Sequence, residues 1–195
     1  MTYGGIVVIT DSGASWHTAE HYKLTCQGVD ACRTIAKTHS ERIRNYKTEI
    51  EGVGRIYGIE STLTAAISSR ESRARYVVHD GWEDWNPSRQ AYNAWGLMQV
   101  DVNPNGGGHT ARGEWDSVEH LCQATEILVY FIDQIRKKIS DLSKEQQLKG
   151  AIAAYNAGDR KVHSYAKVEE NTTGIDYSDD GVGRAEWYEH NRFNG

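Results

Sequence analysis

The chain has 195 residues, enough for a single domain with a buried core. Hydrophobic residues make up 38% and charged residues 25%, which is the usage of a folded globular protein and excludes a disordered chain. The formal net charge of −5 excludes the large basic field that binds nucleic acid. We expect one domain over residues 1–195, without a repeat or a linker.

The first five residues lack the basic start, apolar core and cleavage site of a secretory signal. Two readings stay open: a leader has been removed, or the protein never had one. The longest apolar run, residues 127–132, is far too short to cross a bilayer. We therefore expect a soluble protein with no membrane partner.

The first thirty residues predict loop with at most short strands. Within them, His17 to His21 match H-x-x-E-H, a pattern that binds zinc on a helix with Glu20 as the base. The stretch has no apolar helical pattern, and no third ligand stands out. We therefore predict no metal site.

Residues 41–57 predict one amphipathic helix, with Gly58 as its C-terminal cap. Its apolar positions recur at helical spacing; they are Ile43, Tyr46, Ile50, Val53 and Tyr57. A second apolar run, residues 63–70, leads directly into Glu71. We expect this acid to emerge, buried, where a helix ends.

Residues 73–115 are rich in aromatic residues, Gly and Asn and show little periodicity. Turn signals at Gly81-Trp82 and at residues 105–108 favour a short β-hairpin or an irregular lobe. Such a lobe set against helices forms a cleft.

The longest helix is predicted after Asp116, which forms an Asp version of the capping box with Glu119. Its apolar pattern continues to Ile139, and residues 127–132 are apolar all round. This segment should pass through the domain centre.

Ser143 and Gln146 form another capping box, which opens a helix that Gly158 ends. One stripe of that helix carries Leu148, Ala151, Ile152 and Tyr155. The predicted fold class is α+β and mostly α, with a helical lobe around a long central helix and a small β lobe.

Three short segments together contain the side chains of a possible catalytic site. They are residues 70–72 (Arg-Glu-Ser), 96–101 (Gly-Leu-Met-Gln-Val-Asp) and 154–158 (Ala-Tyr-Asn-Ala-Gly). A carboxylic acid on apolar walls, such as Glu71, has a raised pKa and can protonate a leaving oxygen near neutral pH. The other two segments supply groups that can hold a sugar ring and an attacking water. The set predicts a sugar-cleaving site.

These segments resemble those of the goose-type lysozymes and, more distantly, the lytic transglycosylases. The likeness runs from residues 12–15 through 146–150 to 184–188. It implies a lysozyme-like fold and hydrolysis of the β-1,4 bond between N-acetylmuramic acid and N-acetylglucosamine in bacterial peptidoglycan, as antibacterial defence. Glu71 would be the general acid of an inverting reaction that needs no cofactor.

The resemblance also implies that Asp84 and Asp101 lie opposite the acid and position the hydrolytic water. The segment from Asp84 to Trp95 is longer than in the family, which makes Asp101 the safer assignment. For both aspartates the alternative is a loop cap that accepts bonds from backbone amides. The implied substrate-binding residues are Gln99, His109, Tyr155 and Asn156.

Three cysteines cannot all pair with one another. Bird members of the family carry disulfides near the N-terminus, and this chain has Trp16 where one of those cysteines would stand. That favours a reduced, leaderless protein that acts outside the cell or in a phagocytic or lysosomal compartment. The alternative is a secreted protein with one Cys26–Cys32 bridge. Cys122 should pack as a small apolar group.

Two other functions stay open: a lytic transglycosylase that forms anhydro-muramoyl products, and an inactive peptidoglycan-binding protein. The additional aspartates favour hydrolysis, and the presence of Glu71, Gln99, Asp101 and Tyr155 favours an active enzyme. We expect a monomer whose partners are bacterial peptidoglycan and bacterial lysozyme-inhibitor proteins.

Overall fold

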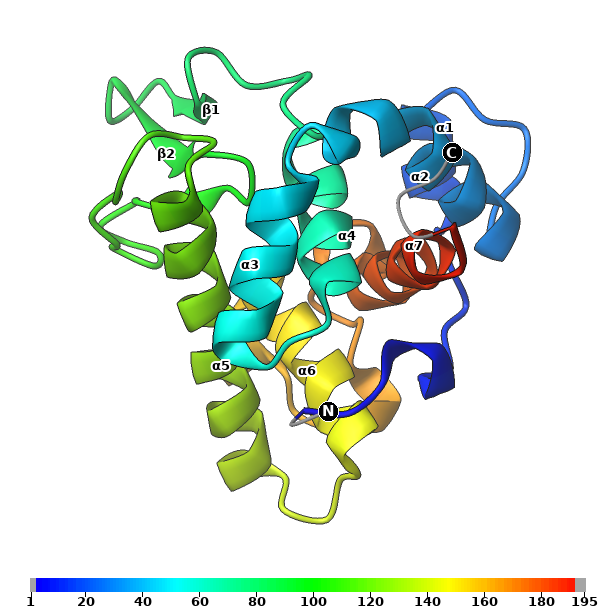
Figure 1. Cartoon of the computed structure of the whole chain (residues 1–195). Helices are drawn as coiled ribbons and strands as arrows, with labels where there is room; N and C mark the ends of the chain where they lie inside the picture. The colour runs from blue at the N-terminus through cyan, green and yellow to red at the C-terminus, as the bar shows by residue number, and fades with distance from the viewer. Residues whose placement is uncertain (1–2, 192–195) are drawn as a thin grey trace.

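The computed structural model describes residues 3–191, which form helices packed beside a small antiparallel sheet (Figure 1). The helices are α1 (Trp16–His21), α2 (Val29–Arg44), α3 (Lys47–Tyr57), α4 (Ser61–Ser72), α5 (Val118–Lys138), α6 (Lys144–Ala157) and α7 (Tyr177–Asn191). The strands are β1 (Trp82–Asn86), β2 (Ala91–Trp95) and β3 (Val100–Asp101). Short 3-10 helices lie at Ile6–Val8, Asp159–Lys161, Tyr165–Lys167 and Thr173–Ile175. The predicted α+β, mostly helical class is confirmed.

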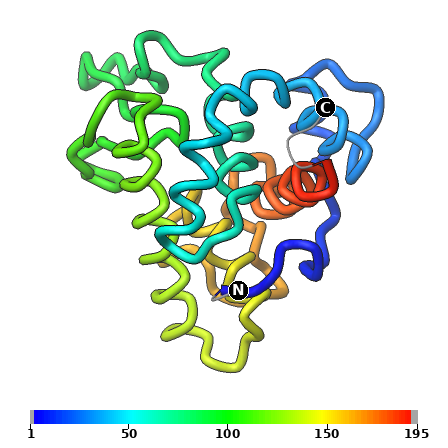
Figure 2. Tube along the Cα trace, viewed as in Figure 1, coloured from blue at the N-terminus to red at the C-terminus, as the bar shows by residue number. Residues whose placement is uncertain are grey.

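Helix α4 is the best-buried helix of the described part of the chain. Residues 62–69 are buried without interruption, because α4 packs against α2, α3 and α7. The tube in Figure 2 shows the chain leaving α4, passing through the sheet lobe and returning along α5. The end of α4 therefore lies where the helical body meets the sheet.

Helix α5 is the longest helix of residues 3–191, as predicted, with 21 residues. Its middle is buried on one side only: Leu128 is buried, whereas Tyr130 is 55% exposed. The prediction that residues 127–132 pass through the domain centre is therefore wrong. An apolar run fixes no burial by itself, and α4 occupies the centre instead.

The helix caps match the predictions in part. Ser143 and Gln146 form the predicted capping box, with N–H to side-chain distances of 3.0 and 3.2 Å. Helix α5 begins one residue later than predicted: Ser117, not Asp116, is its N-cap and accepts from the His120 N–H. Ser117 has the extended backbone that an N-cap requires.

The N-terminal half holds two departures from the predictions. Residues 41–57 are not one helix, because tight turns at Asn45 and Tyr46 separate α2 from α3, although Gly58 caps α3 in the left-handed region as predicted. Helix α1 was predicted as loop. Ser15 caps it, and Thr18 and Ala19 are its buried residues, too few to give an apolar pattern.

The sheet confirms the β-hairpin predicted within residues 73–115, with strand order β1-β2-β3 and both pairings antiparallel. Gly81 precedes β1 with φ +86°, and a Cβ there would lie 2.2 Å from the Trp115 Cβ. The turn into the sheet therefore requires glycine.

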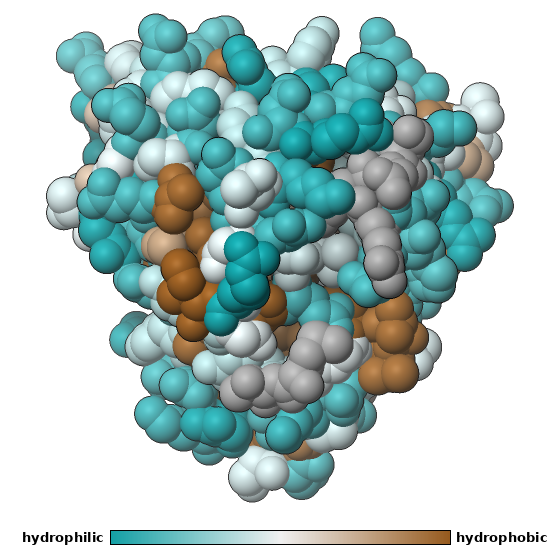
Figure 3. All heavy atoms as spheres, in the orientation of Figure 1, coloured by the Kyte–Doolittle hydropathy of each residue, from teal (hydrophilic) through white to brown (hydrophobic). Residues whose placement is uncertain are grey.

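The surface is mostly polar on the face shown in Figure 3. Apolar side chains form one narrow band over α3 and α5 and a second, smaller patch at the lower right of the view. Among the exposed apolar residues are Val7 and Val8 of the first 3-10 helix, which are 50% and 67% exposed. None of the helices in residues 3–191 is long and apolar enough to cross a membrane.

Candidate active site

Glu71 lies in the last turn of the buried helix α4, as the sequence predicts. Its Oε1 accepts a hydrogen bond from the hydroxyl of Tyr177, a buried residue that begins α7. Burial raises the pKa of Glu71 to about 7, although the Tyr177 hydroxyl and the Arg70 charge act in the opposite direction. Glu71 therefore keeps much of its proton near neutral pH.

Tyr155 comes from α6 and forms a second wall beside this acid. Burial, and then the charge of Glu71, raise the pKa of Tyr155 well above its usual range. Its hydroxyl donates to the Met98 carbonyl at 2.8 Å. Tyr155 thus joins α6 to the segment of residues 96–101, beside the acid.

The turn at residues 96–99 depends on His120 of α5, which the sequence reasoning missed. Gly96 has φ +84°, and a Cβ there would lie 2.2 Å from the imidazole ring. The Met98 N–H donates to His120 Nε2 at 3.1 Å, which requires that nitrogen to be unprotonated. Burial lowers the pKa of His120 to about 4, so the ring stays neutral and can accept this bond.

Gln99 follows in the same turn with φ +48°, and its Nε2 donates to the Gly96 carbonyl at 2.7 Å. Gln99 therefore lies next to Met98, which bonds to Tyr155, but its side-chain amide donates within its own turn.

Asp101 ends β3, is exposed, and organises the loop that follows it. Its Oδ1 accepts from the Asn103 N–H at 2.8 Å, and its Oδ2 accepts from the Gly107 N–H at 2.7 Å. This is the loop-cap arrangement named above as the alternative. The two amides fix the carboxylate, and each oxygen has a further lone pair for a water or a sugar hydroxyl.

Asp84 is also exposed and has φ +57° within β1. Its Oδ2 accepts from Asn93 Nδ2 of β2 at 2.8 Å, and the Asn93 Oδ1 accepts from Arg89. In the longer hairpin, Arg89, Asn93 and Asp84 thus form a row of hydrogen-bonded side chains.

The two remaining substrate-binding candidates, His109 and Asn156, bond to different segments of the chain. The His109 N–H donates to the Asp101 carbonyl at 3.1 Å, which places His109 at the exit of the Asp101 loop. Asn156 Oδ1 accepts from the Thr173 N–H at 2.8 Å. Asn156 therefore anchors the segment that leads into α7 and Tyr177.

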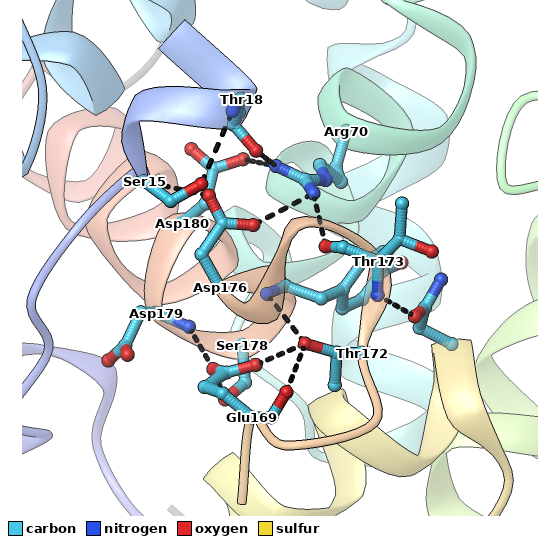
Figure 4. A network of polar contacts seen from close by, with 12 residues as sticks. Ser15, Thr18, Arg70, Glu169, Thr172, Thr173, Asp176, Ser178, Asp179 and Asp180 are labelled. Carbon is cyan, nitrogen blue, oxygen red and sulfur yellow. Dashed lines mark hydrogen bonds and ion pairs between the residues drawn. The ribbon is translucent and has the colours of Figure 1, made fainter.

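An ion-pair network behind Glu71 was not predicted. Arg70 binds Asp180 at 2.5 Å and Asp176 at 3.0 Å (Figure 4), and Arg184 binds Asp180 at 2.7 Å. Burial disfavours the charge of Asp180, yet Arg184 and Arg70 together lower its pKa. The pair of Asp180 and Arg184 could have been predicted from the sequence, because their i,i+4 spacing places them on one face of a helix. The pair of Asp180 and Arg70 could not, because 110 residues separate them.

The H-x-x-E-H segment lies on α1, so the expectation that it is not helical was wrong. Its His17, Glu20 and His21 are all exposed. Residues 3–191 contain no group of three or more His, Cys, Asp or Glu side chains placed to hold a metal ion.

A mostly helical body, a small antiparallel sheet and a half-buried acid with a raised pKa at the end of a buried helix are features of the lysozyme-like glycoside hydrolases. Residues 3–192 match the family described as Lysozyme g. Lysozyme g of Epinephelus coioides is 60% identical over 188 residues, which cover 96% of this chain and 97% of that protein. Lysozyme g of Takifugu rubripes is 48% identical over 193 residues, 98% of each chain.

Lysozyme g of Gallus gallus is 38% identical over 191 residues, which cover 98% of this chain and 86% of that protein. The chain belongs to the lysozyme g family. It is accordingly a glycoside hydrolase with bacterial peptidoglycan as the substrate that its family implies.

Proposed function

We propose that this lysozyme cleaves the β-1,4 bond between N-acetylmuramic acid and N-acetylglucosamine by inversion, with Glu71 as the general acid. The observation that carries the proposal is the position of the half-buried Glu71 at the end of α4, where desolvation raises its pKa to about 7. A protonated carboxyl group can give its proton to the glycosidic oxygen as the bond breaks.

The second part of the proposal concerns the water. In an inverting glycosidase another carboxylate activates a water on the opposite face of the sugar ring. We assign this task to Asp101, with Asp84 in a lesser role. The bonds from Asn103 and Gly107 immobilise the Asp101 carboxylate, which supports the assignment, because a fixed acceptor orients a nucleophile better than a mobile one.

Gln99, His109, Tyr155 and Asn156 are the proposed sugar-binding residues. Gln99 and Tyr155 already bond to the segment that ends in Asp101. A sugar hydroxyl that bonds to either side chain would therefore also be placed with respect to that carboxylate.

Clearing of a suspension of bacterial cells tests the activity, and a mass spectrum of the released sugars tests the reaction. Hydrolysis gives a reducing product, whereas an anhydro product lighter by one water would identify a lytic transglycosylase. Binding to cell walls without clearing would identify an inactive binding protein. Glu71→Gln in the same assay tests the general acid.

We also propose that the protein acts as a monomer in antibacterial defence, outside the cell or in a phagocytic or lysosomal compartment. An acid with a pKa of about 7 is mostly protonated in an acidified compartment. Microscopy of the tagged protein in phagocytes that have taken up bacteria tests the location. Size-exclusion chromatography tests the monomer, and bacterial inhibitor proteins can be tested in the clearing assay.

A further inference from the structure

Tyr177 reaches Glu71 from the first residue of α7, and the segment before it is strained. Ile175 has φ +55°, a left-handed conformation that is unfavourable for a β-branched residue, and Gly174 precedes it with φ +77°. Such a conformation persists only where the surrounding structure holds it. The contacts of residues 172–177 therefore determine where the Tyr177 hydroxyl lies.

Glu169 makes the contacts at the junction between this segment and α7 (Figure 4). Its Oε1 accepts from the Asp179 N–H at 2.7 Å and from the Ser178 hydroxyl. Its Oε2 accepts from the Thr172 hydroxyl at 2.7 Å, and the Thr172 oxygen accepts in turn from the Tyr177 N–H at 3.2 Å. One carboxylate thus binds the chain on both sides of Tyr177.

The charge of Glu169 suits its place at the start of α7. The N–H groups in the first turn of a helix have no partner inside the helix and favour a negative charge. Asp179 is the third residue of α7; its own carboxylate bonds to Lys149 Nζ at 2.6 Å, while its N–H bonds to Glu169. Glu169 therefore fixes the start of α7 as an N-cap side chain would.

Two other side chains hold the middle of the segment. Arg70 donates to the Thr173 carbonyl at 3.0 Å, and Asn156 Oδ1 accepts from the Thr173 N–H at 2.8 Å. Arg70 also acts on its neighbour Glu71 through its charge. A substitution of Arg70 would therefore change charge and position together, so Glu169 offers the cleaner test.

The Tyr177 hydroxyl is the strongest of the influences that oppose burial at Glu71. Burial raises the pKa of Glu71, and the bond from Tyr177 lowers it. The other charged or titratable groups around Glu71 come from four elements: Arg70 of α4, Glu83 of β1, Tyr155 of α6 and Arg184 of α7. The bond also occupies Oε1, so Oε2 is the oxygen left to carry the proton that an acid catalyst transfers. A displaced Tyr177 should therefore raise the pKa of Glu71 and loosen its carboxyl group.

We propose that Glu169 is a positioning residue of the active site, which holds the Tyr177 hydroxyl against Glu71 through Thr172 and the first turn of α7. The inference rests on the proposed function, since positioning Glu71 matters to catalysis only if Glu71 is the general acid. Glu169 then affects the reaction through Tyr177, without touching the substrate.

Carbon-13 NMR titration of the Glu71 carboxyl group in Tyr177→Phe and Glu169→Ala tests the inference, with kcat and KM on soluble peptidoglycan strands as the second readout. In both variants the midpoint should rise by roughly half a pH unit to one unit, because Glu71 loses a hydrogen bond to its ionised form. Turnover should fall roughly tenfold while KM stays within about twofold. The double variant should shift no further than Tyr177→Phe alone, because both changes remove the same bond.

The direction of the shift separates position from charge. Removing the negative charge of Glu169 by itself would lower the Glu71 midpoint, since a nearby anion disfavours ionisation. Glu169→Gln keeps an oxygen that can accept from α7 and an amide that can donate to Thr172, so it should keep the wild-type midpoint and most of the turnover. The matched control is Glu170→Gln, whose ion pair with Lys167 is exposed, and it should leave the midpoint in place.

An unmoved or lowered midpoint in Glu169→Ala would overturn the inference, as would a further shift in the double variant. If Glu169→Ala does not fold, Thr172→Val removes the acceptor of the Tyr177 N–H and should give the same rise, with Thr172→Ser as its control. An unmoved midpoint in Thr172→Val would then overturn the inference. A lytic Glu71→Gln enzyme would instead overturn the proposed function, whatever the midpoints are.

Discussion

The contact between α4 and α7 and the face of the sheet both carry acidic side chains, in opposite settings. At the helix contact, the side chains of Arg70, Asp180 and Arg184 are 9%, 0% and 0% exposed, and these three charges are paired with one another. On the sheet, Asp84 and Asp101 are exposed and bonded within their own hairpin or loop.

The difference follows the two halves of the proposed reaction. An acid that must keep its proton needs a support that removes it from water. The buried end of α4 and the packing of α7 supply this, because burial raises the pKa of Glu71 more than the bond from the Tyr177 hydroxyl lowers it. A carboxylate that orients water needs solvent, which the sheet supplies. Substitutions in the two regions should therefore fail in different ways, the first in protonation or folding and the second in turnover.

The largest effect is expected from Glu71→Gln. Glutamine keeps the shape of the side chain but has no proton to give, so lysis should fall by roughly a thousandfold or more. The far-ultraviolet circular dichroism should stay as in the wild type. Glu41→Gln, an exposed site on α2, is the matched control and should lyse normally. Lysis by Glu71→Gln within tenfold of the wild type would remove Glu71 as the acid.

Asp180→Ala should cost about 3–5 kcal/mol of unfolding free energy, because it leaves the buried Arg184 without its carboxylate and Arg70 with Asp176 alone. The matched control is Asp133→Ala, whose pair with Arg136 is exposed and should be worth less than about 1 kcal/mol. Urea denaturation at pH 7 measures both. Similar losses in the two variants would contradict the contrast between buried and exposed charges.

The ion-pair network of Asp180 should also make the free energy of unfolding depend on pH. The pKa of Asp180 is lowered in the folded state. Its contribution is therefore present above the unfolded pKa of about 3.9 and is lost as the pH falls through the folded value.

On the sheet, Asp101→Asn should lower turnover by roughly ten- to a thousandfold relative to the wild type. The loss in Asp84→Asn should be smaller, because the better-fixed carboxylate of Asp101 orients the water. Michaelis constants should move little, and the double variant should be worse than either single one. Steady-state kinetics on soluble glycan strands give the answer. A more damaged Asp84→Asn enzyme would reverse the assignment.

Glu71 should also reduce stability at alkaline pH. Its pKa rises from 4.5 to about 7 on folding, so its favourable contribution is complete below pH 4.5 and is lost as the pH rises through 7. Glu71→Gln should therefore unfold like the wild type at pH 4 and gain up to about 3 kcal/mol at pH 8. Equal unfolding free energies at pH 8 would show that the acid is not held in its neutral form.

The smallest effect concerns the cysteines, which are unpaired in the described structure. Titration in denaturant should find three thiols, and in native buffer Cys32 should react last. Its Sγ donates to Asp180 Oδ1 at 3.2 Å, and burial raises its pKa. One thiol instead of three would indicate a disulfide and an oxidised protein.

Local features of the sequence predicted some parts of the molecule well. The sequence predicted the caps at Gly58 and Ser143 and the helix whose last turn carries Glu71, because these features depend on residues that are close in the chain. The break at Asn45 and the burial of α4 depend on packing against other helices.

The site divides in the same way. Glu71 could be predicted from the apolar run before it, whereas its partner Tyr177 lies 106 residues away. His120 shapes the turn at Gly96 through a contact that no local pattern reveals. The sequence showed that the segment after Asp84 is long, but it did not predict the hydrogen bond from Asn93 to Asp84.

The central claim is that Glu71 holds its proton at neutral pH, and a carbon-13 NMR titration of its side-chain carboxyl group tests this most directly. Spectra of the wild type and of Glu71→Gln assign the resonance by difference. The account predicts a midpoint at about pH 7. A midpoint at or below the ordinary 4.5 would contradict it, because the acid would then be ionised where the enzyme is proposed to work.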